Sequence, residues 1–171
     1  MNPELLLLCY NNNMSENTSG ADNQQERFLV HPFTSEYVVG LVDGEGYFSV
    51  TAKIRERKNY RAHEVSLVFG MKLSEKDGKV LEFLRDYFGC GNLHYCRDLR
   101  ENFCNCIEYQ VRSQKDVLGI IIPFFRKYPL KFPSKQKAFK YFCEIADIVI
   151  KRKHLDEKGI KKIQHLSKLM H

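Results

Sequence analysis

The most informative segment of the sequence runs from Val38 to Phe48 and reads Val38-Val39-Gly40-Leu41-Val42-Asp43-Gly44-Glu45-Gly46-Tyr47-Phe48. Thr34, just upstream, is a residue type that caps helix N-termini. The segment therefore predicts a short apolar helix that ends in an acidic, glycine-rich turn. Glycine inside a helix costs about 1 kcal/mol relative to alanine. Gly40 and Gly44 nevertheless stand on one face of this helix, which indicates that another helix approaches closely there.

Alternation of apolar and polar residues after this turn predicts strands over residues 47–57, 63–72, 92–98 and 104–113. It places Tyr95 on the inward side and Val68 on the outward side. Helical spacing predicts helices over 74–88, with Ser74 as N-cap and Gly89 as the stop, and over 115–127, 135–153 and 155–171. This order is typical of an α+β fold in which helices cover one face of a four-stranded antiparallel sheet. The other face stays open.

Composition sets broader limits. The chain has 171 residues, 43% of them hydrophobic, and 27 Lys and Arg against 21 Asp and Glu, which excludes a collagen-like, fully disordered or large multidomain protein. The net charge of +6 favours a polyanionic partner. Residues 1–30 are polar and predict a disordered leader, followed by one domain over 31–171. Met14 is a second candidate for the start of the chain.

The sequence contains no pattern that we read as a secretion signal or membrane span, because the apolar run at residues 5–8 is too short. Six cysteines match neither paired Cys-x2-Cys spacing nor a Cys/His finger. We expect reduced thiols in an intracellular protein, in an organelle or a bacterial cytoplasm, and no membrane partner. A zinc site among Cys90, Cys96, Cys104 and Cys106 remains an alternative.

Residues 38–46 resemble the motif of the LAGLIDADG homing endonucleases, with matches at Gly40, Leu41, Asp43 and Gly46. The resemblance extends over residues 33–153. Three further landmarks support it: Phe69-Gly70-Met71 before Lys76-Asp77, then Phe88-Gly89-Cys90-Gly91-Asn92-Leu93, then Ile122-Pro123-Phe124-Phe125-Arg126-Lys127-Tyr128-Pro129-Leu130 with Lys135 five residues on. It implies the αββαββα fold of this family, whose sheet saddles the major groove of double-stranded DNA.

We find one copy of the motif in this sequence, and the resemblance therefore implies a homodimer on a pseudo-palindromic DNA site. The motif helices of the two copies would pack against each other. The residues implied at this dimer interface are Val39, Gly40, Asp43 and Gly44. Asp43 is expected to cap a helix of the partner copy.

The resemblance also implies metal-dependent phosphodiester hydrolysis, with Glu45 and the carbonyl oxygen of Gly44 as metal ligands. Mg2+ or Mn2+ would support cleavage, and Ca2+ would support binding without cleavage. Lys135 aligns with the active-site lysine of the family, and Lys137 is the alternative if the preceding loop shifts the alignment. Leu73 stands where the family often has a water-organising Gln, so we expect either that Lys72 or Lys76 substitutes for it or that turnover is impaired.

The outward side chains of the strands are the expected DNA contacts, and about a third of them are expected to touch only water or phosphate. They are Ser49, Thr51, Lys53, Arg55, Arg57, Glu64, Ser66, Asn92, His94, Glu108, Gln110 and Arg112. On charge alone, a solvated sheet face explains them equally well. A non-cleaving relative of the same fold, acting as a maturase on intron RNA or as a DNA-binding regulator, is the alternative function. An unrelated basic α+β binding module is the third possibility.

Overall fold

The structure is a computed structural model that describes residues 33–57, 60–97 and 105–170. The predicted leader over 1–30, the hairpin tip at Asn59 and the candidate zinc ligand Cys104 lie outside the described residues. Phe33–His171 forms one compact unit, to which the following paragraphs refer. Within the described ranges, no helix has the length and apolar character needed to cross a membrane.

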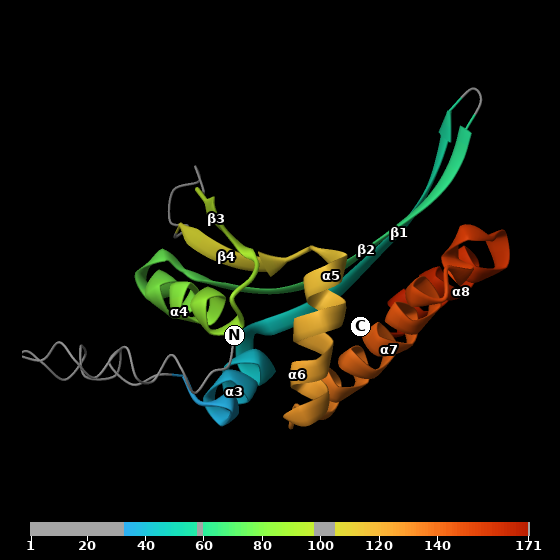
Figure 1. Ribbon diagram of the computed structural model, residues 1–171. Coiled ribbons are helices and arrows are strands. Elements are labelled where there is room, and N and C mark those ends of the chain that lie inside the picture. Colours follow the sequence, from blue (N-terminus) through green and yellow to red (C-terminus); the bar gives the residue numbers. More distant parts are fainter. Residues whose placement is uncertain (1–32, 58–59, 98–104, 171) are drawn as a thin grey trace, which may run out of the picture. The chain divides into compact units, whose positions relative to one another are not determined.

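Four antiparallel strands form one sheet in the order β1-β2-β4-β3. β1 (Gly46–Arg57) pairs with β2 (Tyr60–Ser74) along its whole length. β4 (Cys106–Val111) pairs with the end of β2, and β3 (Asn92–Cys96) pairs with β4. Figure 1 shows the β1–β2 hairpin extending beyond the two shorter strands. The predicted four-stranded antiparallel sheet is therefore confirmed.

The helical layer consists of α3 (Ser35–Glu45), α4 (Gly78–Phe88), α7 (Pro133–Ile150), α8 (Glu157–Leu169) and one continuous helical stretch between β4 and α7. That stretch comprises α5 (Gln114–Asp116), the π-helical η2 (Val117–Ile121) and α6 (Ile122–Lys127). Two short 3-10 turns, η1 (Glu75–Asp77) and η3 (Lys153–Leu155), precede α4 and α8. The predicted helices are confirmed, and the one over 115–127 contains a π turn that its sequence does not signal.

The ends of two helices can be compared with the capping residues that the sequence predicts for them. Thr34 Oγ1 accepts a hydrogen bond from the Tyr37 amide at 3.2 Å, as its N-cap prediction requires. Gly89 ends α4 with a φ of 63°, which glycine adopts easily. Ser74 stands at the predicted N-cap position, before η1, which runs directly into α4, but it still pairs with Cys106 in the sheet and its side chain makes no cap bond. The α-helical part begins only at Gly78.

Aromatic side chains build the core between the sheet and the helices. The Phe48 ring lies 5.5 Å from Phe69, 5.7 Å from Phe125 and 5.2 Å from Phe142, measured between ring centroids. All four side chains are buried, and burying each contributes on the order of 2 kcal/mol. Phe48 follows the acidic turn by two residues, so this cluster anchors the start of β1 directly beneath the end of α3.

α8 fastens the C-terminal part of the unit to the outer strand. Its side chains at Gln164 and Ser167 donate to the carbonyl oxygens of Ala52 and Val50 on β1, at 3.4 and 3.3 Å. Its apolar face, which includes Ile160 and Ile163, is fully buried. The prediction of a last helix over 155–171 is therefore confirmed, with shorter bounds.

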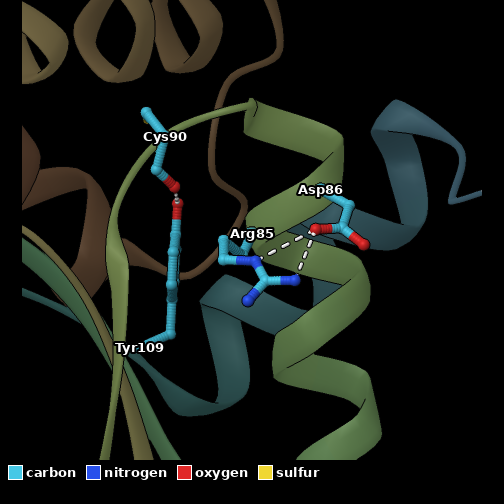
Figure 2. A network of polar contacts seen from close by, with 4 residues as sticks. All are labelled: Arg85, Asp86, Cys90 and Tyr109. Carbon is cyan, nitrogen blue, oxygen red and sulfur yellow. Dashed lines mark hydrogen bonds and ion pairs between the residues drawn. The ribbon is translucent and has the colours of Figure 1, made fainter.

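Tyr109 on β4 anchors the turn between α4 and β3 (Figure 2). Its hydroxyl group donates to the carbonyl oxygen of Cys90 at 2.9 Å, while Arg85 and Asp86 pair at the surface of α4 nearby. A Cβ atom at Gly91 would come within 2.6 Å of the Tyr109 ring, so only glycine fits this turn. Burial raises the pKa of Tyr109, which keeps its hydroxyl protonated as a donor.

Two side chains lie on the predicted side of the sheet but are not exposed or buried as that side suggests. Val68 faces the open side of the sheet but is only 7% exposed. Tyr95 stands opposite the buried Ile107, on the inward side, but is 65% exposed, because β3 is an edge strand whose end the helices do not cover. Strand alternation gives the side of the sheet and not the depth of burial.

Candidate functional site

The acidic turn lies where α3 meets β1. Glu45 is the last residue of α3, and its carboxylate is exposed. Within the described residues, no hydrogen bond or ion pair engages it. Gly46 then turns the chain into the sheet, and a Cβ atom there would come within 2.6 Å of the Val42 side chain and 2.8 Å of the Val42 carbonyl oxygen. The close turn at Gly46 therefore presents Glu45 at the surface beside the first residue of the sheet.

Asp43 has a different role from the one expected. Its carboxylate is only 3% exposed and accepts hydrogen bonds from the main-chain amides of Lys131 and Phe132, at 2.8 and 3.2 Å. These amides precede α7 in the same chain, where a carboxylate also interacts favourably with the helix dipole. The prediction that Asp43 caps a helix of a partner copy is corrected: it fastens α3 to α7 within one chain.

Lys135, in the first turn of α7, completes this connection. Its ammonium group donates to the carbonyl oxygen of Gly46, the residue after Glu45. The half-buried Lys135 is therefore bonded to the residue that follows Glu45. Lys137 is exposed on the same helix, and no such contact is found for it within the described residues. The structure thus connects Lys135 to the main chain next to Glu45, from 90 positions away in the sequence. A joint catalytic role of the two side chains stays a prediction.

The other lysine expected to act with them points elsewhere. Lys72 lies on the open face of β2, and its pKa is raised because its ammonium group hydrogen-bonds with the Cys106 side chain. Leu73 packs against the hydrophobic core opposite Ile107. It therefore has neither the chemistry nor the position to organise a water molecule. Lys76 is exposed in η1.

The outer face of α3 is bare. Gly40 and Gly44 are both exposed, and among the described residues no atom outside the chain neighbours and the backbone of α3 lies within 4 Å of a Cβ atom built at either position. Val39 is only 5% exposed and, like Asp43, is buried in its own chain. Of the four predicted interface residues, the two glycines therefore leave an open helix surface, and the prediction for Val39 is corrected because its side chain is already buried.

The open face of the sheet forms a hollow. It is lined by Tyr47, Ser49, Thr51, Lys53, Arg55, Glu64, Ser66, Val68, Gln110 and Arg112. Eight of these are predicted DNA contacts, gathered from three strands. Asn92, His94 and Glu108 continue the same face toward β3. Arg57 belongs to β1, but its side chain lies outside the described part.

Four residues on this face are linked by hydrogen bonds. Arg112 Nε donates to Gln110 Oε1 at 2.6 Å, Gln110 Nε2 donates to Tyr47 Oη at 2.7 Å, and Tyr47 Oη donates to Glu108 Oε1 at 2.8 Å. Burial and the bond to the Glu108 carboxylate raise the pKa of Tyr47 to about 12. We call these four residues the Tyr47 network. Elsewhere on the face, Arg55 pairs with Glu64 at 2.6 Å, with both side chains exposed.

Sequence reasoning missed Tyr47 as a site residue. It lies on the outward side of the predicted strand, but tyrosine is ambiguous between packing and polar contact. Gln110 was expected to contact DNA freely, whereas it is 7% exposed and bonded at both ends of its amide. The register that aligns these strands could not be read from the sequence.

The donors at the end of α3 suit a hard divalent cation. Glu45 provides an exposed carboxylate and Gly44 a carbonyl group without a side chain to shield it, and Mg2+ prefers oxygen ligands and retains water and phosphate oxygens. The C-terminal end of a helix also carries partial negative charge. For zinc, no cluster of three or more His, Cys, Asp or Glu side chains occurs within 33–57, 60–97 and 105–170.

Comparisons with known proteins agree with this architecture. The family model for LAGLIDADG endonuclease matches residues 38–146. "Probable intron-encoded endonuclease 2" of Neurospora crassa is 30% identical over 128 residues, which are 74% of this chain and 27% of that protein. The chain thus spans about a quarter of that relative.

Two solved structures show the same fold. The homing endonuclease I-TnaI superposes with a TM-score of 0.68 and 29% identity over 80% of this chain and 87% of its own. I-SmaMI, bound to an uncleaved DNA target in the presence of calcium ions, gives a TM-score of 0.69 and 30% identity over 79% of this chain and 44% of its own.

Proposed function

This chain belongs to the LAGLIDADG endonuclease family, and we propose that it makes a site-specific, metal-dependent double-strand cut in a long pseudo-palindromic DNA site. The observation that carries this proposal is the hydrogen bond from the Lys135 ammonium group to the carbonyl oxygen of Gly46, the residue next to the exposed Glu45 at the end of α3. A carboxylate for a metal and a cation for phosphate are the groups that phosphodiester hydrolysis needs.

DNA would lie against the open face of the sheet. A twisted two-stranded ribbon such as the β1–β2 hairpin enters a major groove, where arginine, lysine and amide side chains can pair with base edges. Lys53 and Arg55 line the hollow on this face. The Arg55–Glu64 ion pair is exposed and therefore weak, so Arg55 can exchange it for a phosphate or a guanine.

A second copy of the chain would provide the other half of the site. The exposed face of α3 around Gly40 and Gly44 lets a second motif helix approach, because no side chain of the described residues covers it. Such packing brings the Glu45 carboxylates of both copies to one axis, one for each DNA strand. I-SmaMI, of which this chain covers 44%, is bound to its DNA target as a chain about twice as long.

Glu45 and the Gly44 carbonyl group would hold Mg2+ or Mn2+, and bound metal activates a water molecule and stabilises the leaving oxygen of an in-line displacement. Lys135 uses one of its three N–H groups on the Gly46 carbonyl oxygen. The remaining two can donate to a scissile phosphate. Asp43 holds Lys135 in place by fixing the start of α7.

A library of partly randomised palindromic DNA tests this function. The purified chain is incubated with the library in Mg2+ and, separately, in Ca2+, and bound and cut sequences are read while the mass of the complex is recorded. We expect selective binding in both ions and double-strand cuts only in Mg2+, by a dimer. Selective binding without cuts in Mg2+ and Mn2+ would instead support the non-cleaving maturase or regulator, in agreement with Leu73. Absence of selective binding would contradict the proposal.

A further inference from the structure

We propose that Tyr47 is a positioning residue that, through Gln110, aims the guanidinium group of Arg112 at one guanine in each half of the DNA site. The inference rests on the proposed DNA binding, and adds which residue reads a base and which residues only hold it. It also means that Gln110 and Glu108, which were both expected to contact DNA, support other side chains and do not read bases.

The register of the sheet places two members of the network, Tyr47 and Gln110, in one row. Tyr47 pairs with Gly70, Gly70 pairs with Gln110, and Gln110 pairs with Asn92, so the row crosses all four strands. Glu108 and Arg112 lie two residues to either side of Gln110 along the chain. Tyr47 must pass over β2 to reach β4. It can do so because position 70 has no side chain: a Cβ atom there would come within 2.5 Å of the Tyr47 hydroxyl oxygen and 2.8 Å of the Tyr109 carbonyl oxygen.

The hydrogen bonds of the Tyr47 network run in one direction, from Arg112 through Gln110 and Tyr47 to Glu108. Arginine can only donate, so the amide oxygen of Gln110 must face Arg112 and its nitrogen must face Tyr47. The Tyr47 hydroxyl group accepts a hydrogen bond from that nitrogen and donates one to the Glu108 carboxylate. Each of the four side chains is bonded to another member, which restricts its rotamers and strengthens the bonds along the network.

This arrangement engages both ends of the Gln110 amide group. Recognition of adenine needs both the oxygen and the nitrogen of an amide side chain, and each already uses one of its two hydrogen-bonding positions within the network. The side chain is also 7% exposed. Gln110 therefore acts as a support and does not read a base.

Arg112 is exposed directly after β4 and lines the hollow. Its Nε atom is held by Gln110, and within the described residues its two terminal nitrogen atoms have no hydrogen-bond partner. Guanine offers O6 and N7 in the major groove, and a planar arginine fork matches them with two parallel hydrogen bonds. Holding the guanidinium group in advance reduces the entropy lost on binding.

The test measures base preference in Ca2+, so that cleavage does not interfere. Wild type is compared with Arg112→Lys, Tyr47→Phe and the control Tyr87→Phe, whose hydroxyl group contacts Ser35 away from the sheet. Each position of the selected site is substituted in turn and the relative affinity is measured. Tyr47→Phe keeps the ring above Gly70, and urea unfolding checks that every variant folds.

We expect wild type to prefer guanine at one position of each half-site by roughly 5- to 150-fold. Arg112→Lys keeps the charge and the overall affinity but loses this preference. Tyr47→Phe reduces the preference severalfold at the same position only, and Tyr87→Phe leaves it unchanged.

Three results would overturn the inference, and they are distinguishable. If Arg112→Lys retains the guanine preference, Arg112 does not read that base. If Arg112→Lys loses it while Tyr47→Phe keeps it in full, Tyr47 has no positioning role. If wild type shows no base preference at any position, the proposed site-specific DNA binding fails as well.

Discussion

The ammonium group of Lys135 donates a hydrogen bond to the carbonyl oxygen of Gly46, across 89 positions of the sequence. Asp43 makes the complementary connection, from α3 to the amides that precede α7. Together these contacts fasten the end of the motif helix to the start of α7. The Lys135 ammonium group is therefore held by the fold at the main chain of the residue next to Glu45.

Replacing Lys135 with methionine tests this cation directly. Methionine retains most of the apolar stem but cannot donate to Gly46 or to a phosphate. We expect cleavage at saturating protein to fall by roughly 100-fold or more, with a far smaller loss of DNA affinity. Lys137→Met is the matched control, because Lys137 is exposed on the same helix. Equal loss of cleavage in both variants would assign no special role to Lys135.

Asp43→Ala should destabilise the fold itself. It leaves the amides of Lys131 and Phe132 without their buried acceptor, and we expect the free energy of unfolding in urea to fall by about 2 to 3 kcal/mol. Asp147→Ala removes an exposed carboxylate of α7 that lies 4.0 Å from Arg126, and should cost less than about 1 kcal/mol. A similar small loss for both would show that the Asp43 contacts contribute little.

Gly40→Glu should separate folding from assembly. A side chain at this position meets no atom of its own chain, so the monomer should fold, whereas a charged side chain would block the approach of a second helix. We expect sedimentation with cognate DNA to show loss of the dimer and of double-strand cutting. Gly119→Glu, at another exposed glycine with open surroundings, is the control. A dimer that persists in Gly40→Glu would place the interface elsewhere.

Tyr47 makes a specific contribution to stability at alkaline pH. Its pKa is about 12 in the folded chain, against about 10 when unfolded, so the unfolded state loses the proton first. The stabilisation is therefore complete below pH 10 and is lost as pH rises toward 12. We expect the difference in unfolding free energy between wild type and Tyr47→Phe to be constant from pH 7 to 9 and to shrink above pH 10. A difference that stays constant to pH 12 would contradict the buried, bonded hydroxyl group.

Much of this architecture follows from local patterns. Thr34 caps α3, Gly89 stops α4, and alternation over 47–57 gives the two sides of β1 because these signals act over a few residues. That Lys135 lies next to the turn that carries Glu45 could be expected only from the family resemblance. The two residues are far apart in the sequence, and no local pattern connects them.

The errors have one physical origin, which is contact between distant segments. Asp43 finds its hydrogen-bond donors 88 and 89 positions away, so a helix-end carboxylate could not be assigned to its own chain. Tyr47 reaches the side chains of β4 only because Gly70, its partner in the strand register, has no side chain in the way. Val68 is buried by neighbouring strands instead of by the core.

Single-turnover cleavage of the selected DNA site by Glu45→Gln, in Mg2+, tests the central claim most directly. Glutamine keeps the size of the side chain and removes the charge that would hold the metal, and Glu82→Gln on the exposed side of α4 is the control. We expect Glu45→Gln to bind the site in Ca2+ like wild type and to make no cuts, while Glu82→Gln cuts normally. Cleavage by Glu45→Gln at the wild-type rate would contradict the assignment of this carboxylate as the metal ligand.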